Sequence, residues 1–393
     1  MEKIINTIQY KLAILRRQAI VEKKRSVRVY DYKKYLNSSN RKPKKALVSY
    51  LVNPVIDELS GIQTSLFSNN GAGRTIPKLL NELGYTVDVI NWDDTRPIAG
   101  KYDLVIFHGG KNFDQIKKLK TNNNKLVYYS TGSYWRYHND EEQKRLDYFE
   151  KRHNKKYKLD REIQDAEEQA NTKSDAIISL GNQDTANTYA KFKHVYHLAG
   201  ASMPIASSRS IQTTDADGLG FLFMAGPGNL HKGLDIVLDA WAKLPKNLHL
   251  HIITYLDDDF VDYYRKQLYD TSNIHTHGYI MQRSEQYYEI INQCQFSILL
   301  SCSEGSPGSV IESMHQGLIP VVSRQSHIDI GDNGYILKKN TVEELENIIQ
   351  ALSQIKQNEI VQSQLELRSW AEQSFAVQKY EKEFAAILKE ITK

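Results

Sequence analysis

The sequence predicts an α/β protein made of two Rossmann-like, doubly wound domains that face each other across a cleft. Two series of alternating strand and helix patterns follow one another along the chain, separated by a weakly periodic stretch, 200–217. The length of 393 residues suits two domains of ordinary size. The hydrophobic fraction of 40% and the charged fraction of 25% are typical of soluble globular proteins. Clefts between two such domains are common ligand sites.

The first domain is predicted over 46–205. Short apolar runs, of the kind that form buried parallel strands, alternate there with helical stripes. The expected strands are 46–52, 85–91, 102–107, 126–130, 176–180 and 194–197. A polar, glycine-containing loop at 68–71 precedes an apolar helical stripe that ends at Gly84, and the charged residues 140–172 are expected to be helical.

The second domain is predicted over 215–365, with the same alternation. The expected strands are 219–225, 248–254, 274–277, 296–301 and 319–323. The expected helices are 233–244, 260–269, 284–294, 307–316 and 341–355. Residues 366–393 carry a further apolar stripe and are expected to form one or two C-terminal helices, which could pack back on the first domain.

Residues 1–45 form a basic arm, with fourteen Lys or Arg and three Asp or Glu, whereas the rest of the chain is net acidic. Apolar residues at helical spacing over 3–21 predict an amphipathic helix. This helix would rest on an anionic membrane surface or pack on its own domain or a second subunit. The arm has no nucleic-acid-reading motif, so a nucleic-acid partner is not expected. No signal peptide is expected either, which favours a cytoplasmic location. Cys294 and Cys302 lie in or beside an apolar stretch and are expected to be buried free thiols.

The most informative segment follows the predicted strand 296–301. Glu304 lies in a tight loop after this strand, with Ser306 suited to a helix N-cap and Pro307 to the first helical position. The amides of Gly308, Ser309 and Val310 (308–310) would then point out of the helix start, where the helix dipole favours an anion such as a diphosphate. Glu312 lies roughly 7–8 Å further along the helix, at about 1.5 Å per residue. Two carboxylates that flank an anion site suit the paired hydroxyls of a sugar and a ribose.

The segment EGSPGSVIESMHQGLIPVV at 304–322 resembles the Glu-x7-Glu motif of retaining GT-B glycosyltransferases, in particular family four, the glycosyl transferases group 1. The resemblance covers about 46–390 and is specific across about 220–337. It implies the GT-B fold, a nucleotide-diphosphate sugar as donor, contact of Glu304 with the donor sugar and contact of Glu312 with the donor ribose. It implies no cofactor and no metal ion.

A second match to this family lies upstream, where Lys232 and Gly233 follow a predicted strand. The resemblance implies that Lys232 neutralises the leaving diphosphate, because charge grows there as the glycosidic bond breaks. Most relatives carry an arginine five residues before this lysine, where this chain has Pro227. His231 or Arg283 would have to supply the missing contact.

Other candidate residues follow from their positions after predicted strands. The turn that contains Tyr279 and Ile280 resembles the nucleobase site of the family, although an ordinary strand-to-helix loop is equally compatible with it. His108 and His138 are candidates for an acceptor-side histidine, with His108 preferred. Residues 257–259, three consecutive aspartates, are expected to start a helix rather than bind a metal ion.

The sequence therefore predicts a retaining glycosyltransferase that moves a sugar from a nucleotide-diphosphate sugar to a saccharide or lipid-linked acceptor in surface polysaccharide or glycolipid synthesis. The cytoplasmic enzyme would act at the inner face of the cell membrane if residues 1–45 bind anionic lipid. The first alternative is another GT-B chemistry, such as that of a nucleotide-sugar epimerase or a phosphorylase. The phosphate or pyridoxal site that a phosphorylase would need has no signature in the sequence. The alternative from another class is a non-catalytic GT-B subunit that supports a partner enzyme, for which Pro227 leaves room.

Overall fold

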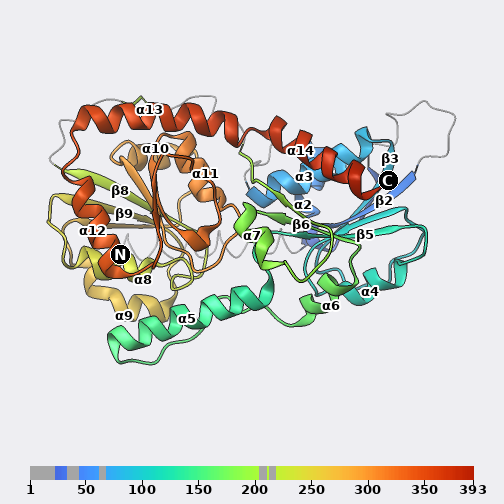
Figure 1. Cartoon of the computed structure of the whole chain (residues 1–393), viewed down its shortest axis with the longest axis horizontal. Coiled ribbons are helices and arrows are strands. Elements are labelled where there is room, and N and C mark those ends of the chain that lie inside the picture. Colours follow the sequence, from blue (N-terminus) through green and yellow to red (C-terminus); the bar gives the residue numbers. More distant parts are fainter. Residues whose placement is uncertain (1–22, 33–43, 62–67, 203–209, 212–217) are drawn as a thin grey trace.

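A computed structural model describes residues 23–32, 44–61, 68–202, 210–211 and 218–393. Two domains lie side by side, and each is a central sheet with helices on both faces (Figure 1). The predicted fold class is confirmed. The predicted amphipathic helix 3–21 lies outside the described residues.

The N-terminal sheet has seven strands in the order β1-β3-β2-β4-β5-β6-β7. The strands are β1 (Val29–Tyr32), β2 (Lys44–Tyr50), β3 (Tyr85–Asn91), β4 (Leu104–Phe107), β5 (Lys125–Ser130), β6 (Ala176–Leu180) and β7 (Val195–Leu198). All neighbours are parallel except β1, which pairs antiparallel with β3 at the sheet edge. The assignment of 1–45 to a separate arm is therefore wrong for its described part, because 29–32 belong to the sheet and β2 begins at Lys44.

The C-terminal sheet has six parallel strands in the order β10-β9-β8-β11-β12-β13. The strands are β8 (Leu219–Met224), β9 (Leu248–Ile253), β10 (Ile274–Gly278), β11 (Phe296–Leu299), β12 (Ile319–Ser323) and β13 (Tyr335–Leu337). The chain starts at β8 in the middle, fills one side of the sheet and then the other, which makes the sheet doubly wound. Ligands of such sheets bind at the carboxyl ends of the strands, at the point where the direction of winding reverses. Here that point lies between β8 and β11.

Helices connect the strands. Those of the N-terminal half are α2 (Asn53–Leu59), α3 (Ser68–Glu82), α4 (Phe113–Ile116), α5 (Trp135–His153), α6 (Ala166–Lys173) and α7 (Gln183–Thr188). Those of the C-terminal half are α8 (Leu234–Trp241), α9 (Asp258–Tyr269), α10 (Glu285–Ile291), α11 (Gly308–His315), α12 (Val342–Leu352), α13 (Gln357–Ser374) and α14 (Val377–Ile391). The loop expected at 68–71 is instead the first turn of α3.

Helix α5 starts beside the N-terminal sheet but packs on the C-terminal domain (Figure 1). Leu146 and Phe149 of this helix belong to the core of the C-terminal domain. The buried guanidinium of Arg145 donates to the carbonyl of Leu300 at 2.7 Å, and Arg152 pairs with Asp235. Helix α5 lies within the predicted first domain, 46–205, but its side chains contribute to the core of the other domain.

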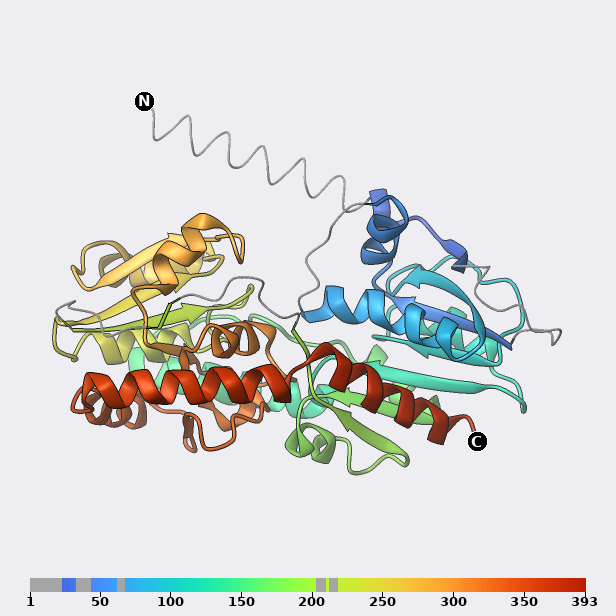
Figure 2. The ribbon, with the colours of Figure 1, turned by 90° about the horizontal axis from the view of Figure 1, so that it is seen from above.

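Helices α13 and α14 run end to end across both domains (Figure 2). Helix α13 packs on α11, and α14 contacts β7 and α3 of the N-terminal domain. The hydroxyl groups of Tyr380 and Tyr129 lie 3.0 Å apart, and Phe384 is fully buried beside them. The expected start of the C-terminal helices at residue 366 falls inside α13.

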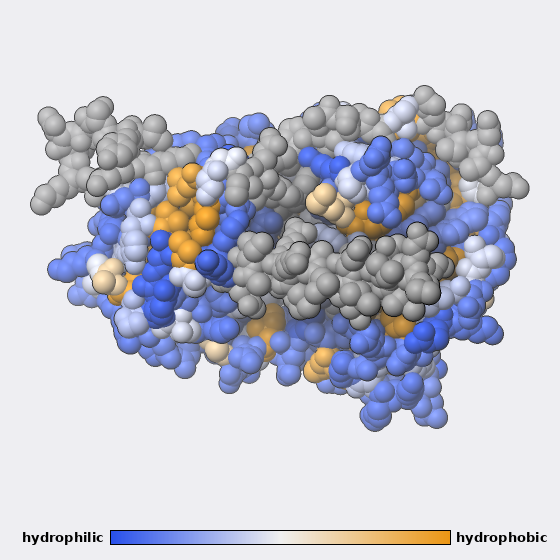
Figure 3. Space-filling view, turned by 180° about the vertical axis from the view of Figure 1, so that it is seen from behind, coloured by the Kyte–Doolittle hydropathy of each residue, from blue (hydrophilic) through white to orange (hydrophobic). Residues whose placement is uncertain are grey.

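The face seen from behind is mostly hydrophilic, with smaller apolar areas on both domains (Figure 3). Within the described part of the chain, no helix combines the length and the apolar character that a membrane span requires. Cys294 and Cys302 are both buried and free, as predicted.

Candidate functional site

Glu304 lies in the loop between β11 and α11, at the carboxyl ends of the strands of the C-terminal sheet. Its carboxylate forms an ion pair with Lys232 and accepts a hydrogen bond from Ser301 Oγ at 2.9 Å. His231 Nε2 lies 3.3 Å from the same oxygen, Oε1. The loop itself is fixed by the amide of Glu304, which donates to the carbonyl of Gln325 at 3.0 Å.

Lys232 lies in the loop between β8 and α8, on the other side of the point where the winding reverses. Its side chain is only 9% exposed. Burial lowers the pKa of Lys232, and Glu304 opposes this effect. Burial alone would raise the pKa of Glu304, but Lys232 and His231 hold it well below its usual range. The structure thus brings Glu304 and Lys232, two of the three predicted catalytic residues, together as an ionised pair; the third is His108.

His231 lies between two carboxylates. Its Nδ1 contacts Glu142 of α5, and its Nε2 faces Glu304. Burial opposes protonation, but the neighbouring Cys302 thiol and the two carboxylates raise the pKa of His231 to about 10. His231 is therefore an imidazolium at neutral pH, and it supplies a second positive charge beside Glu304.

Arg161 is a basic residue of this site that the sequence analysis missed. It lies in the segment between α5 and α6, where its amide donates to Glu142 Oε2 at 3.4 Å and its carbonyl accepts from His138 Nε2 at 2.7 Å. A Cβ on Gly228 would lie 2.8 Å from Arg161 Cδ, so the arginine passes directly over the loop that carries Lys232. Its charge also lowers the pKa values of Lys232 and Glu304. No spacing in the sequence marks Arg161, because it reaches the site from the other half of the chain.

Helix α11 starts one residue later than predicted. Pro307 occupies the N-cap position and Gly308 is the first helical residue. Ser306 does not cap the helix; its backbone is left-handed, with φ +56°, and its hydroxyl accepts from the amide of Gly200 at 2.9 Å. The amide of Val310 donates to the carbonyl of Pro307 at 3.1 Å. Of the three amides predicted to bind an anion, those of Gly308 and Ser309 therefore remain the suitable donors.

Glu312 is fully buried in α11 and is already engaged by protein groups. Arg283 donates to it through Nη2 at 2.9 Å and Nε at 3.1 Å, and Ser202 Oγ donates at 3.4 Å. Arg283, a predicted substitute for the missing phosphate contact, thus neutralises Glu312 instead. A ribose at this position would meet Arg283 as well as the carboxylate.

The predicted nucleobase turn follows β10. Tyr279 is exposed and stacks on Tyr255, with ring centroids 4.6 Å apart and 15° between the planes. Ile280 is buried in an apolar cluster with Tyr287 of α10. An exposed aromatic pair beside a buried anchor offers a flat surface at the carboxyl edge of the sheet.

The two candidate histidines of the N-terminal domain differ in position. His108, at the end of β4, points Nδ1 at the carbonyl of Tyr129, at 2.9 Å, and packs against Tyr50 and Trp92. Among the contacts recorded for the described residues, none joins His108 to Glu304 or Lys232. His138 is the histidine that reaches this site, where its ring stacks on that of His231 at 5.1 Å. Burial, and next the charge of His231, lower the pKa of His138 to about 4.

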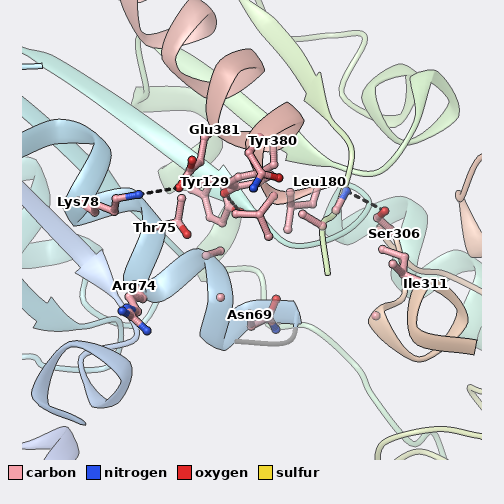
Figure 4. A pocket seen from close by; sticks show the side chains of 18 of the residues that line it. Asn69, Arg74, Thr75, Lys78, Tyr129, Leu180, Ser306, Ile311, Tyr380 and Glu381 are labelled. Atoms are coloured by element: carbon pink, nitrogen blue, oxygen red, sulfur yellow. Dashed lines mark hydrogen bonds and ion pairs between the residues drawn. The ribbon is translucent and has the colours of Figure 1, made fainter. Parts of the chain in front are cut away.

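A cavity of about 490 Å³ opens between the domains beside this site. Figure 4 shows Asn69, Arg74 and Thr75 of α3 on one side and Ser306 and Ile311 on the other. Lys78 and Glu381 close the far end through an ion pair of 3.1 Å. The cavity borders the loop of Glu304 through Gly305.

His138, Glu142 and His231 form a buried group whose ligand atoms lie within 4.8 Å of one another. In this structure they form an ion-pair network, with the two rings stacked at 29° and His138 Nε2 bound to a carbonyl.

The predicted helix start at 257–259 is found, because Asp257 is the N-cap residue of α9.

Comparison with known proteins agrees with this geometry. Residues 220–354 match the family model of glycosyl transferases group 1. No curated protein sequence matches the chain significantly.

Solved structures resemble most of the chain. Sucrose-phosphate synthase from Thermosynechococcus elongatus has a TM-score of 0.62 at 13% identity, over 89% of this chain and 99% of that one. HepE from Anabaena, in complex with UDP and glucose, has a TM-score of 0.58 at 15% identity, over 88% of this chain and 100% of that one. TarM from S. aureus has a TM-score of 0.54 at 13% identity, over 72% of this chain; the chain spans about half the length of TarM, 54%.

Likeness at this level of identity establishes the fold, and the family match covers the domain that holds Lys232, Glu304 and Glu312. Both agree with the resemblance predicted from the Glu-x7-Glu motif. The chain is therefore a two-domain GT-B protein whose C-terminal domain matches the glycosyl transferases group 1 family.

Proposed function

We propose that the chain is a retaining glycosyltransferase that moves a sugar from a nucleotide-diphosphate sugar to a saccharide or lipid-linked acceptor. The observation that carries this proposal is the ion pair of Lys232 with Glu304 beside the start of α11. A buried ammonium and a helix N-terminus suit the two phosphates of a leaving nucleotide. A carboxylate next to them suits a sugar hydroxyl or the developing charge at the anomeric carbon.

The diphosphate has three kinds of partner in this proposal. Lys232 turns from Glu304 to the phosphate, the amides of Gly308 and Ser309 donate to the other phosphate oxygens, and Arg161 covers the entrance. Arg161 then fills the role left open by Pro227, because its side chain lies over Gly228, the next residue. Glu304 stays ionised when Lys232 leaves, because His231 and Ser301 remain its partners.

The nucleoside lies along the C-terminal domain in the same proposal. Glu312, with Arg283, receives the ribose, and the turn of Tyr279 and Ile280 receives the base. The structure of HepE in complex with UDP and glucose supports UDP as the first nucleotide to test.

The interdomain cavity is the proposed acceptor site. It has polar groups from α3 on one side and the loop of Glu304 on the other, so an acceptor hydroxyl there can approach the donor sugar. No metal ion is proposed for the transfer, since Lys232, Arg161 and the amides of α11 supply the positive charge. His108 remains a predicted acceptor-side residue.

The experiment that tests the proposal is thermal stabilisation with UDP, GDP, ADP and CMP in parallel. A ligand that binds only the folded state at a hundredfold excess over Kd stabilises it by about 2.7 kcal/mol. One nucleotide is expected to stabilise the wild type and to have little effect on Lys232→Ala. Stabilisation of both proteins to the same extent would place the nucleotide elsewhere.

Turnover separates the enzyme from a non-catalytic GT-B subunit. The purified chain is expected to release the nucleotide from its sugar conjugate, slowly with water and faster with an acceptor, and Glu304→Gln is expected to lose this release. Nucleotide binding without turnover, unchanged in Glu304→Gln, would favour the supporting subunit. The retaining outcome is tested by the anomeric configuration of the product in NMR spectra.

We further propose that the basic arm brings the cytoplasmic enzyme to an anionic membrane surface, for synthesis of surface polysaccharide or glycolipid. The fourteen basic residues among the first 45 support this proposal. Because 29–32 belong to the sheet, the test deletes only 1–22. The shortened chain lacks the predicted helix 3–21 but keeps ten of the fourteen basic residues, so it is expected to bind anionic vesicles more weakly at low salt and to keep nucleotide binding. Equal binding of both proteins to the vesicles would contradict a membrane role of the predicted helix.

A further inference from the structure

Four histidines gather on one face of the C-terminal sheet, away from the site described above. His249 and His251 alternate along β9, and His275 and His277 alternate along β10, the edge strand. Side chains two residues apart on a strand point to the same face. The strands are parallel with His275 opposite His251, so all four rings share this face.

The rings form one continuous column. Successive centroids along it are 5.5 Å apart for His249 and His275, 4.7 Å for His275 and His251, and 5.4 Å for His251 and His277. The interplanar angles are 28° or less. We call these four residues the histidine column.

Within the column the nitrogens pair across the strands. His249 Nδ1 lies 3.2 Å from His275 Nε2, and His251 Nδ1 lies 3.2 Å from His277 Nε2. Two imidazole nitrogens bound to one ion at about 2.0–2.1 Å lie about 2.9–3.4 Å apart when they occupy neighbouring coordination positions. At 3.2 Å each pair is joined by an N–H···N hydrogen bond in this structure. The same spacing suits two ligands of one transition-metal ion, which would replace the shared proton.

The column is partly open at the edge of the sheet. His251 is buried and the other three histidines are half-buried, so water can reach the column from the side of β10. An ion could therefore enter from this side and keep water molecules as further ligands.

The opposite face of the same strands shows what ordinary packing looks like here. Leu250 and Ile252 of β9 and Ile274 of β10 point into the main core of the domain. β-Branched and aliphatic residues are the usual choice for a half-buried strand, and four histidines in their place give no comparable packing gain. Their shared property is eight ring nitrogens within one column.

We propose that the histidine column binds divalent transition-metal ions. His249 with His275, and His251 with His277, would each supply two ligands to one ion, and water would supply the rest. Imidazole ligands favour Zn²⁺, Cu²⁺ or Ni²⁺, whereas Mg²⁺ and Ca²⁺ favour oxygen ligands. A bound ion would link β10 to β9. It would thereby stabilise the edge strand and the turn of Tyr279 that follows it. The inference does not depend on the proposed transfer reaction.

The test uses the full chain, freed of metal with a chelator and titrated with Zn²⁺ by calorimetry and with Cu²⁺ by electron paramagnetic resonance. The spectrum of bound Cu²⁺ is expected to show splitting by nitrogen ligands. His275→Asn with His277→Asn removes one ligand from each pair and is expected to abolish saturable Zn²⁺ binding and this splitting. Mg²⁺ is expected to give no saturable binding at the column.

Two control proteins make the result specific. His194→Asn with His197→Asn removes the same number of histidines at β7, the edge strand of the other sheet, and is expected to bind as the wild type does. Glu142→Gln disrupts the other group with metal-ligating residues, at His138 and His231, and is also expected to bind normally.

A folded His275→Asn, His277→Asn protein that binds Zn²⁺ like the wild type would overturn the proposal, as would loss of binding in Glu142→Gln alone. The absence of any saturable binding by the wild type at about a hundredfold excess of Zn²⁺ would overturn it too. If the double variant does not fold, His275→Asn and His277→Asn are tested singly. Each single variant breaks one pair and is expected to lower the Zn²⁺ affinity or to halve the number of ions bound. Unchanged Zn²⁺ binding in both single variants would contradict the proposal.

Discussion

Replacing Lys232 by methionine tests the proposed site most directly, because it removes one buried charge and keeps the length of the side chain. If Lys232 stabilises the leaving diphosphate, its loss removes one preorganised electrostatic contact from the transition state. Loss of such a contact costs about 2.7–4 kcal/mol, or about 10²–10³ in kcat. The side chain is 9% exposed, so solvent screens its charge little and the upper part of this range is expected.

The same change affects the free energy of unfolding to a smaller extent. An ion left unpaired in the interior costs about 3–5 kcal/mol. Glu304, however, keeps His231 at 3.3 Å and Ser301 at 2.9 Å as partners. We therefore expect a loss of about 1.5–3 kcal/mol, the value of one hydrogen bond to a charged group.

Two assays separate these effects. Release of nucleoside diphosphate from the donor measures turnover, and urea unfolding measures stability. Lys243→Met is the matched control, because Lys243 belongs to the same domain but its ion pair with Glu346 is at the surface, with 64% of the lysine exposed. This control is expected to lose at most about 1 kcal/mol of stability and no activity. A folded Lys232→Met protein that turns over its donor at the wild-type rate would refute the proposed role.

Three other contacts described above can be tested by single substitutions. Arg161→Met is expected to weaken nucleoside diphosphate binding about tenfold, because the proposed partner of Arg161 is the phosphate. Stability should change little, because the residue is exposed. Calorimetric titration measures the nucleotide affinity of the wild type and the variant. Glu142→Gln is expected to change the pH dependence of unfolding, measured in urea from pH 6 to 10. In the wild type the pKa of His231 rises from 6.5 to about 10 on folding, so its stabilisation is complete below pH 6.5 and is lost as the pH rises toward 10; without Glu142 the loss is smaller. Phe384→Ala is expected to cost about 3–5 kcal/mol in thermal or urea unfolding, because it opens a cavity where α14 meets the N-terminal sheet.

Each of these predictions has its own control. Arg265→Met, in an exposed ion pair of α9, should leave nucleotide affinity unchanged. Glu150→Gln, on α5 and away from His231, should leave the pH curve parallel to that of the wild type; a parallel curve for Glu142→Gln would contradict the assigned network. A loss below about 1 kcal/mol in Phe384→Ala would mean that α14 contributes little to holding the domains together.

The strands were largely predictable because of their burial. The strands at 219–224 and 319–323 are buried throughout and almost entirely apolar, since both of their faces are covered, and such runs are distinct in a sequence. Strands β1 and β13 were missed. They have four and three residues, lie at sheet edges and carry exposed side chains, so neither length nor pattern distinguishes them from loops.

The site was predictable where its residues directly follow strands of one sheet. Glu304 and Lys232 each follow a strand of the C-terminal sheet, and the topology of a doubly wound sheet places such positions together. The contacts of Glu312 with Arg283 and the position of Arg161 over Gly228 depend on side-chain packing between distant segments. Neither produces a spacing or a periodicity, so only the structure reveals them.

The path of α5 has a consequence for how this protein can be divided. The C-terminal domain is continuous in sequence from β8 onward, but Leu146 and Phe149, which fill its core, are encoded some seventy residues before β8. A fragment that begins at residue 218 would expose the surface these side chains cover and leave Asp235 without Arg145 and Arg152. The C-terminal domain therefore needs α5 as well as its own continuous segment from β8 onward in order to fold. Exchange of whole donor domains between related enzymes should succeed only when α5 and the following segment with Arg161 are exchanged with them.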